Sequence, residues 1–287
     1  MKLISAYFLI FIFLCVPYSI RAEDAQRKAD SLYRAGAYYE ASLEYERSYF
    51  LASDPAQRCL ALLEKAECLK QIGEYSKAAA RLREVPHFGV SDSLFSRLAY
   101  QIALCDYLAG DFQAARAALT ENDLSFINKG DSQNACLLKV LIWNELHQYD
   151  SAQLTAIQYV RNTISNAEEA AKYETSLNYL YKPRRIPKIR NAESAVWMSR
   201  FIPGLGQTWL GYPGEGSISF LLNASALGLG IYGIISGYPI TGYFLGASFL
   251  QKFYFGGLNR TEYLAGRRNY AVTKAFNDSV RKGLSIK

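Results

Sequence analysis

The residue types that most often carry out catalysis are few in this chain and are widely separated. The two histidines, His87 and His147, lie far apart in the sequence, and no C-x-x-C pair occurs. The neighbouring carboxylates Glu168 and Glu169 fit a solvated helix face better than an acid–base pair. A zinc site or a nucleophile with its base is therefore not expected. The cysteines beyond residue 22 are Cys59, Cys68, Cys105 and Cys136. We predict that the chain is not an enzyme and holds no metal ion or cofactor.

One glycine-rich stretch resembles a loop that cradles phosphates. It reads Pro-Gly-Leu-Gly-Gln over residues 203–207. A nucleotide loop requires a preceding strand and a following Lys-Ser/Thr, and the sequence has neither here. The stretch is instead predicted to form a tight turn, where glycines let two backbones approach closely beside a membrane hairpin. The residues assigned to this motif are Pro203, Gly204, Gly206, Gln207, Gly211 and Gly216.

A pattern of glycine, aromatic residue and alanine recurs four times in the first half of the chain. The aromatic positions step by 37 residues each time, through Tyr38, Tyr75, Phe112 and Tyr149. A glycine precedes each aromatic residue by two positions, except in the fourth copy, where His147 takes its place. Such a unit predicts two helices: the glycine ends the first in a left-handed conformation, and the aromatic residue begins the second. The alanine three residues later lets the helices pack closely. These alanines are Ala41, Ala78, Ala115 and Ala152.

This pattern resembles the tetratricopeptide repeat (TPR), although the period is longer by three residues. The fold class predicted from the resemblance is all-α: a TPR-like solenoid of helical hairpins, followed by a hydrophobic helical hairpin. Four repeats would occupy residues 23–164, and residues 165–181 would form a capping helix. Cys68 and Cys105 occupy equivalent positions about 10 Å apart, too far for a disulfide.

The resemblance also implies a concave groove lined by one row of first-helix side chains. Tyrosines mixed with charged and amide groups suit an extended peptide or a partner's helix, so we expect an unidentified protein or peptide partner. The alternative is a solvated groove whose residues contact only their own repeats. Carrying the register over gives Tyr33, Arg34, Glu67, Lys70, Arg97, Tyr100, Tyr107 and Asn144 as groove residues.

The N-terminus has the features of a secretory signal. Lys2 precedes an apolar stretch over residues 3–16, and Ala22 suits a cleavage site. Residues 1–22 are therefore predicted to be a signal peptide, with an uncleaved membrane anchor as the alternative.

The C-terminal third predicts a membrane anchor. Residues 182–200 are a basic linker with a short interfacial helix, residues 201–258 a hydrophobic hairpin, and residues 259–287 a basic tail. Residues 216–251 carry no charge and are broken near Tyr238 and Pro239. Two arms of about 27 Å fall slightly short of a hydrocarbon core of about 30 Å. Small residues would bring the arms together: Ala226 with Gly230, and Gly242 with Gly246. The alternative is a buried helical pair of a soluble protein.

The segment around the Pro-Gly-x-Gly-Gln motif is similar to a small bacterial membrane domain of two hydrophobic helices with no established activity. We therefore expect an exported scaffold in a bacterial inner membrane, with its repeats on the periplasmic side. The basic residues that flank the hairpin favour the cytoplasm instead, and contact with anionic headgroups would relieve that conflict. No nucleic-acid partner is expected. The alternative function is a structural, self-associating component in which the hairpin is the functional part.

Overall fold

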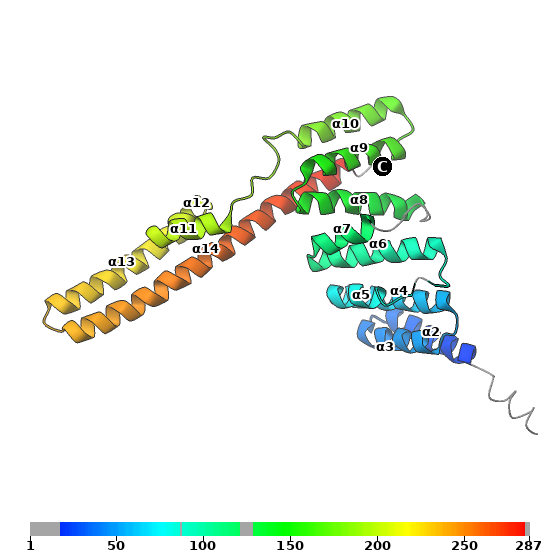
Figure 1. The fold of residues 1–287 in the computed structure, drawn as a ribbon, viewed down its shortest axis with the longest axis horizontal. Helices are drawn as coiled ribbons and strands as arrows, with labels where there is room; N and C mark the ends of the chain where they lie inside the picture. The colour runs from blue at the N-terminus through cyan, green and yellow to red at the C-terminus, as the bar shows by residue number, and fades with distance from the viewer. Residues whose placement is uncertain (1–17, 87, 121–128, 285–287) are drawn as a thin grey trace, which may run out of the picture. The chain divides into compact units, whose positions relative to one another are not determined.

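The computed structural model describes residues 18–86, 88–120 and 129–284, and these form thirteen helices and no strand. The chain divides into two compact units, of which one holds the described residues up to Tyr181 and the other holds Lys182–Gly283. Figure 1 shows the helices of both units. The all-α prediction is confirmed for the described residues.

The first unit consists of helices that pack in consecutive pairs. The pairs are α2 (Tyr18–Arg34) with α3 (Tyr38–Leu51), α4 (Pro55–Gln71) with α5 (Tyr75–Leu82), α6 (Asp92–Ala109) with α7 (Phe112–Thr120), and α8 (Lys129–Glu145) with α9 (Tyr149–Thr163). Helix α10 (Ala167–Leu180) packs on α9 and corresponds to the predicted cap. Each pair also contacts the next along the chain, through α3 with α4, α5 with α6 and α7 with α8.

The four predicted turns share one backbone geometry. Gly36, Gly73 and Gly110 have φ of 78°, 79° and 84°, and His147 has φ of 59° in the same left-handed region. Each ends its helix with the same two hydrogen bonds; in the fourth turn these are His147 N to Asn144 O and Gln148 N to Trp143 O. This is the Schellman arrangement, which satisfies the last carbonyls of a helix. The prediction that these positions end the first helices is confirmed, and the aromatic residues begin α3, α5, α7 and α9.

The repeated alanines lie where the two helices of a pair meet. All four are 0% exposed, so no larger side chain fits without separating the helices. Around them, leucines and cysteines fill the core between pairs, including Leu62, Leu82 and Cys105. Side-chain caps fix several helix starts: Asp54 accepts from Gln57 N ahead of α4, as its sequence Asp-Pro favours.

The second unit contains α11 (Ala192–Phe201), α12 (Leu205–Trp209), α13 (Pro213–Ile235) and most of α14 (Pro239–Leu284). Helices α11, α12 and α13 pack in sequence, and α13 runs beside the first part of α14 in Figure 1. The turn between α13 and α14 has Gly237 at φ 86°, at the predicted break. Helix α14 is one continuous helix of 46 residues, and it joins the expected second arm to the expected basic tail.

The predicted signal peptide lies mostly outside the described residues, which begin at Tyr18. Its predicted cleavage site, Ala22, lies inside α2. Ala22 is buried, and its carbonyl accepts a hydrogen bond from Ser48 Oγ on α3.

Candidate functional site

The Pro-Gly-Leu-Gly-Gln stretch forms a closely packed junction, here called the collar, between α11, α12 and the bases of α13 and α14. A Cβ on Gly206 would lie 1.9 Å from Ala195 O on α11, and a Cβ on Gly204 would lie 2.0 Å from Gly216 O on α13. A Cβ on Gly216 would in turn lie 2.2 Å from Thr208 Oγ1. The glycines are therefore required by backbone contact, as the sequence predicted.

Hydrogen bonds join the collar to α14. Ser199 Oγ accepts from Gly206 N at 3.1 Å and pairs with Thr261 Oγ1 at 3.2 Å. Gln207, which is 1% exposed, donates from Nε2 to Gly257 O at 3.1 Å. These bonds fix α12 against α14 at the level of Gly257. The phosphate-cradle alternative has no room, because backbone and side-chain atoms already occupy the space above the glycines.

The two remaining motif residues have local roles. Pro203 lies half-buried in the turn between α11 and α12. Gly211 has φ of 97° and ends α12, where Tyr212 N donates to Gln207 O at 3.0 Å. Both help to reverse the chain twice within a few residues, so that α11, α12 and α13 can share one junction.

Charged and aromatic side chains surround the collar. Arg260 forms a two-point ion pair with Glu215 at 2.6 and 2.8 Å, and the Arg190 guanidinium lies 4.9 Å from the Trp209 ring centre. The side-chain amide of Asn269 on α14 accepts a hydrogen bond from Arg190 N at 3.0 Å and donates one to Arg190 O at 2.8 Å. Aromatic rings beside cations are typical of the region where a protein meets lipid headgroups.

Sequence reasoning missed two of these contacts, those of Thr261 and Asn269. Both residues lie in α14, 62 and 79 positions from their partners Ser199 and Arg190. No local pattern marks such a pair, because a single threonine or asparagine on a polar helix is ordinary. The packing of the collar against this part of α14 therefore appears only in the three-dimensional structure.

Glycines also form the seam between α13 and α14. A Cβ on Gly230 would lie 3.1 Å from Gly246 Cα, and a Cβ on Gly233 would lie 2.7 Å from Gly242 Cα. Gly246 also approaches Ala226, whose carbonyl oxygen is 3.5 Å from the added Cβ. The prediction that Ala226, Gly230, Gly242 and Gly246 let the two arms approach closely is confirmed, and Gly233 also takes part in the contact.

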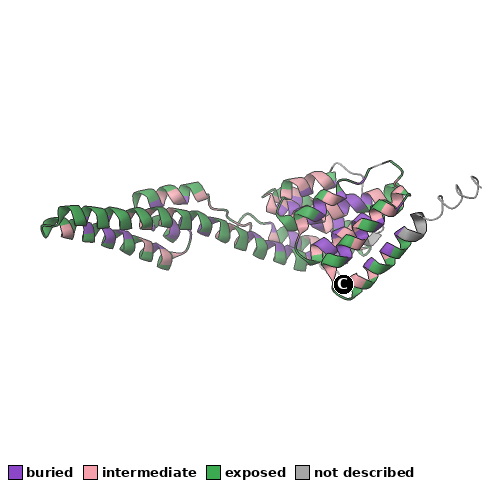
Figure 2. Ribbon diagram, turned by 90° about the horizontal axis from the view of Figure 1, so that it is seen from below, coloured by how far each residue is buried: buried purple, intermediate pink, exposed green. Residues whose placement is uncertain are grey.

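The outside of this hairpin is exposed, as the predominantly green ribbon of α13 and the first part of α14 in Figure 2 shows, and many of its exposed side chains are large and apolar. Among the described residues, α13 is the one helix long and apolar enough to cross a membrane. The uncharged first part of α14, residues 239–251, continues into a basic segment. Large exposed side chains on the two arms include Ile218, Phe220, Leu221, Leu229, Ile231, Ile235, Ile240, Phe244, Leu245 and Phe249.

Two buried side-chain carbonyl oxygens, one in the collar and one in α13, lack hydrogen-bond partners. They are Gln207 Oε1 and Asn223 Oδ1, and each amide donates from its nitrogen, Asn223 to Ser219 O at 2.8 Å. A Cβ on Gly257 would lie 2.8 Å from Ser219 Oγ, so both amides lie near one contact of α13 with α14. The interior of the hairpin base is therefore polar as well as closely packed.

The predicted groove residues have very different environments. Tyr100 is 9% exposed, and Asn144 is 0% exposed and accepts a hydrogen bond from Tyr181 at 3.1 Å. Their side chains belong to the core. Tyr33 and Tyr107 are half-buried, and each packs its ring on the aromatic residue that begins the next helix, Tyr38 or Phe112.

Two of the charged members of the set, Arg34 and Arg97, are exposed and more accessible than the tyrosines. Lys70 is mostly buried, and it pairs with Glu67 at 2.5 Å and with Gln101 at 2.9 Å. The polar partners of Lys70 and Glu67 therefore lie within the fold, whereas the side chains of Arg34 and Arg97 are exposed.

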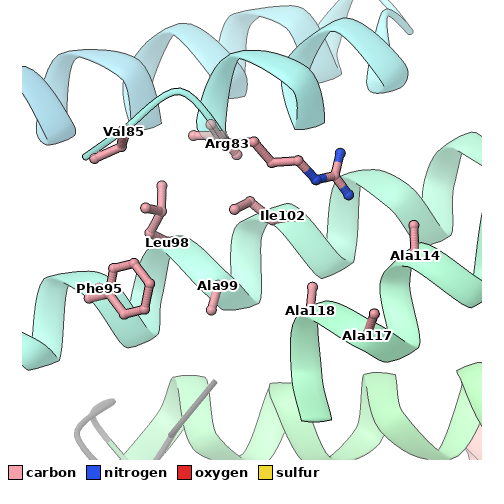
Figure 3. A pocket seen from close by; sticks show the side chains of 10 residues that line it. Arg83, Val85, Phe95, Leu98, Ala99, Ile102, Ala114, Ala117 and Ala118 are labelled. Atoms are coloured by element: carbon pink, nitrogen blue, oxygen red, sulfur yellow. The ribbon is translucent and has the colours of Figure 1, made fainter. Parts of the chain in front are cut away.

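An apolar cavity of about 490 Å³ lies between α5, α6 and α7. Figure 3 shows Phe95, Leu98 and Ile102 on its floor, with three alanines of α7 along one side. Arg83 lies at its edge and forms an ion pair with Asp106. None of the predicted groove residues lines this cavity. Its lining residues are Leu82, Arg83, Val85, Phe95, Leu98, Ala99, Ile102, Ala114, Ala117 and Ala118.

The four described cysteines of the first unit are free, and three of them are buried. Cys59, Cys68 and Cys105 are buried, and burial raises the pKa of each thiol to about 11. They are protonated at neutral pH and behave as small apolar side chains. Cys68 and Cys105 are both free in this structure. Within the described ranges, no three His, Cys, Asp or Glu side chains are placed to hold a metal ion.

The chain was compared with known proteins in three ways. No family model matches it, and neither a curated protein nor a solved structure matches it.

Proposed function

We propose that this protein is a membrane-anchored scaffold, in which TPR-like repeats present a protein-binding surface and the C-terminal hairpin holds them at a bilayer. The observation that carries the proposal is the exposed apolar exterior of α13 and the first part of α14, closed on the inside by a glycine seam. In a soluble protein this run of exposed apolar side chains would contact water, and soluble monomers rarely expose extended apolar patches.

The dimensions of the hairpin support insertion across a bilayer. From Glu215 to Ile235 the rise is about 30 Å, equal to a hydrocarbon core. The collar marks one end of this length with Trp197, Trp209 and the Arg260 ion pair. At the other end the exposed tyrosines Tyr232, Tyr238 and Tyr243 surround the turn. Aromatic residues at both ends are the usual arrangement of a segment that crosses a membrane.

Four equivalent helical hairpins support the scaffold part. Their shared turn geometry and buried alanines fit a TPR-type solenoid, whose long surfaces bind peptides or helices of other proteins. With Tyr100 and Asn144 in the core, the binding surface would be centred on Arg34 and Arg97 and on the edges of Tyr33 and Tyr107. We further propose that the repeats face the periplasm of a bacterial inner membrane.

Reporter fusions combined with membrane extraction test this function. A periplasm-active and a cytoplasm-active reporter are fused in turn after Lys182 and after Lys287, and membranes are washed at alkaline pH. The scaffold proposal expects both sites to report from the periplasm and the protein to resist the wash. Release by the wash would rule out the hairpin anchor, and cytoplasmic signals at both sites would rule out export.

A further inference from the structure

One cation, Lys252, lies on the outer surface of the hairpin among exposed apolar side chains. The contacts of Gly230 with Gly246 and of Ser219 with Gly257 set the antiparallel register of the two arms. In that register Lys252 on α14 is level with Ala224, which is the middle of α13. No described residue forms an ion pair with Lys252, and its side chain is exposed.

The surroundings of Lys252 place it in the hydrocarbon layer. Large apolar side chains remain exposed between its level and the collar, among them Phe220, Leu221 and Phe255. A hairpin inserted only as far as Lys252 would leave these three in water. Arg260, at the collar, lies eight residues further along, about 12 Å away.

The direction of the helix prevents Lys252 from escaping easily to the headgroups. Side chains of a helix lean toward its N-terminus, and the N-terminal end of α14 is the hairpin turn. Lys252 therefore leans away from the nearer headgroup layer at the collar. The turn end, at Pro239, is about 20 Å away, beyond the reach of one lysine side chain.

Lys252 also belongs to a polar stripe on the face of α14 that is turned away from α13. It follows Gly246 by six residues and precedes Gly257 by five, which puts it away from the seam in a helix of 3.6 residues per turn. Thr241, Ser248 and Asn259 fall on the same face, at steps of seven, four and seven residues with Lys252, and all are exposed. Polar residues of a membrane helix normally face another helix rather than lipid.

We propose that this stripe, Thr241, Ser248, Lys252 and Asn259, binds a transmembrane helix of another protein that carries an Asp or Glu level with Lys252. Charge complementarity identifies the occupant: cations within a membrane are normally paired, and an Asp or Glu carries the opposite charge. A second copy does not supply one, because residues 216–251 are uncharged and equally inserted copies would bring two lysines together. The inference rests on the membrane hairpin proposed above.

Site-specific photocrosslinking of the full-length protein in membranes of its native cells tests the proposal. The crosslinking amino acid p-benzoylphenylalanine replaces Ser248 in one variant. In the control variant it replaces Leu229, which is exposed at nearly the same level on α13. The expected result is a protein adduct from position 248 alone, containing a membrane helix with a carboxylate. Lys252→Leu should reduce the adduct at least tenfold, whereas Lys252→Arg should preserve it.

A charge swap makes the test specific. Lys252→Glu should abolish the adduct, and Lys in place of the partner's carboxylate should restore it. Adducts with lipid only, adducts with a second copy, or an adduct unchanged by Lys252→Leu would overturn the proposal. Membranes that contain each variant are also washed at alkaline pH. Release of the parent protein would refute the hairpin anchor itself. Retention of the parent protein without an adduct would refute only the partner helix.

Discussion

At the scale of single residues, the fourth repeat shows how strongly the turn geometry is imposed. His147 adopts φ of 59° where the other three repeats have glycine, and it still makes both helix-ending hydrogen bonds. A non-glycine residue in this conformation is strained by about 1 kcal/mol. The sequence pattern identified His147 as the glycine equivalent although its chemistry differs, because the residues around it keep the 37-residue register.

Replacing His147 by glycine should therefore stabilise the protein. We expect His147→Gly to raise the free energy of unfolding by about 0.5–1 kcal/mol, since relief of strain exceeds the added entropy of the unfolded chain. Urea unfolding followed by circular dichroism measures the difference. Gly110→Ala is the matched comparison: its φ of 84° should make that variant less stable by about 1 kcal/mol. The His147 Nδ1 atom lies 3.2 Å from the Tyr149 hydroxyl, and a destabilised His147→Gly would show that this contact contributes more than the strain costs.

The ion pair of Arg83 with Asp106 predicts a pH dependence. Burial raises the pKa of Asp106, and Arg83 opposes that rise. In Arg83→Met the folded-state pKa of Asp106 should rise further above its unfolded value. A raised carboxylate pKa gives stability that is present below the unfolded value of about 4 and is lost as pH increases through the folded value. Arg83→Met should therefore cost about 1–2 kcal/mol at pH 7.5, since Arg83 is half-exposed, and much less at pH 4. Urea unfolding at both pH values measures this, and Asp106→Asn in the same background should remove the pH dependence.

At the scale of helices, close backbone contact decides the arrangement of the second unit. Both glycine groups were predictable, because small residues at four-residue spacing and the Pro-Gly-x-Gly-Gln motif are local signals. The extent of α14 was not: an apolar run and a basic tail suggested separate elements, yet no proline lies between residues 251 and 260, and α14 continues through Gly256 and Gly257. Helix continuity depends on the absence of a break, and a change of composition does not supply one.

The collar predicts a sharp difference between neighbouring glycines. Gly206→Ala would place its Cβ 1.9 Å from Ala195 O, so α11 and α12 must separate, and we expect a loss of more than 2 kcal/mol. Gly214→Ala has open space around its Cβ and should be neutral or slightly stabilising. Thermal unfolding in detergent, followed by Trp197 and Trp209 fluorescence, compares the two. Equal melting temperatures of the two variants would refute the close contact at the collar.

The seam makes a parallel prediction within α13. Gly230→Leu should force α13 and α14 apart, because its Cβ would already lie 3.1 Å from Gly246 Cα. Gly228→Leu, two residues earlier, meets open space and should leave the hairpin intact. Cysteines introduced at Ala226 and Leu250 in a background free of other thiols report the spacing by disulfide formation. We expect at least a tenfold slower reaction in Gly230→Leu, and an unchanged rate there would contradict the glycine seam.

At the scale of the whole molecule, the 37-residue register predicted the helix pairs of the first unit, because each pair is fixed by contacts between near neighbours in sequence. The same register predicted a groove less well. Asn144 and Tyr100 were assigned to a surface row, but Asn144 accepts a hydrogen bond from Tyr181, 37 residues further on and just after α10. A capping helix buries positions that are open in an ideal repeat, and periodicity carries no information about the last helix of the array.

The division into two compact units leads to the last prediction. A fragment of residues 23–181 keeps the helix pairs of the first unit, with α2 shortened by its first five residues, and contains none of the exposed hairpin. It should remain soluble without detergent and unfold cooperatively, because its apolar residues are buried between consecutive pairs. A fragment of residues 182–287 should instead float with phospholipid vesicles in a density gradient, since the exposed side chains of α13 favour hydrocarbon. Light scattering of the first fragment and flotation of the second measure these outcomes. Aggregation of residues 23–181 would show that the repeats require the C-terminal unit, and a fragment 182–287 that fails to float would argue against the hairpin as the anchor.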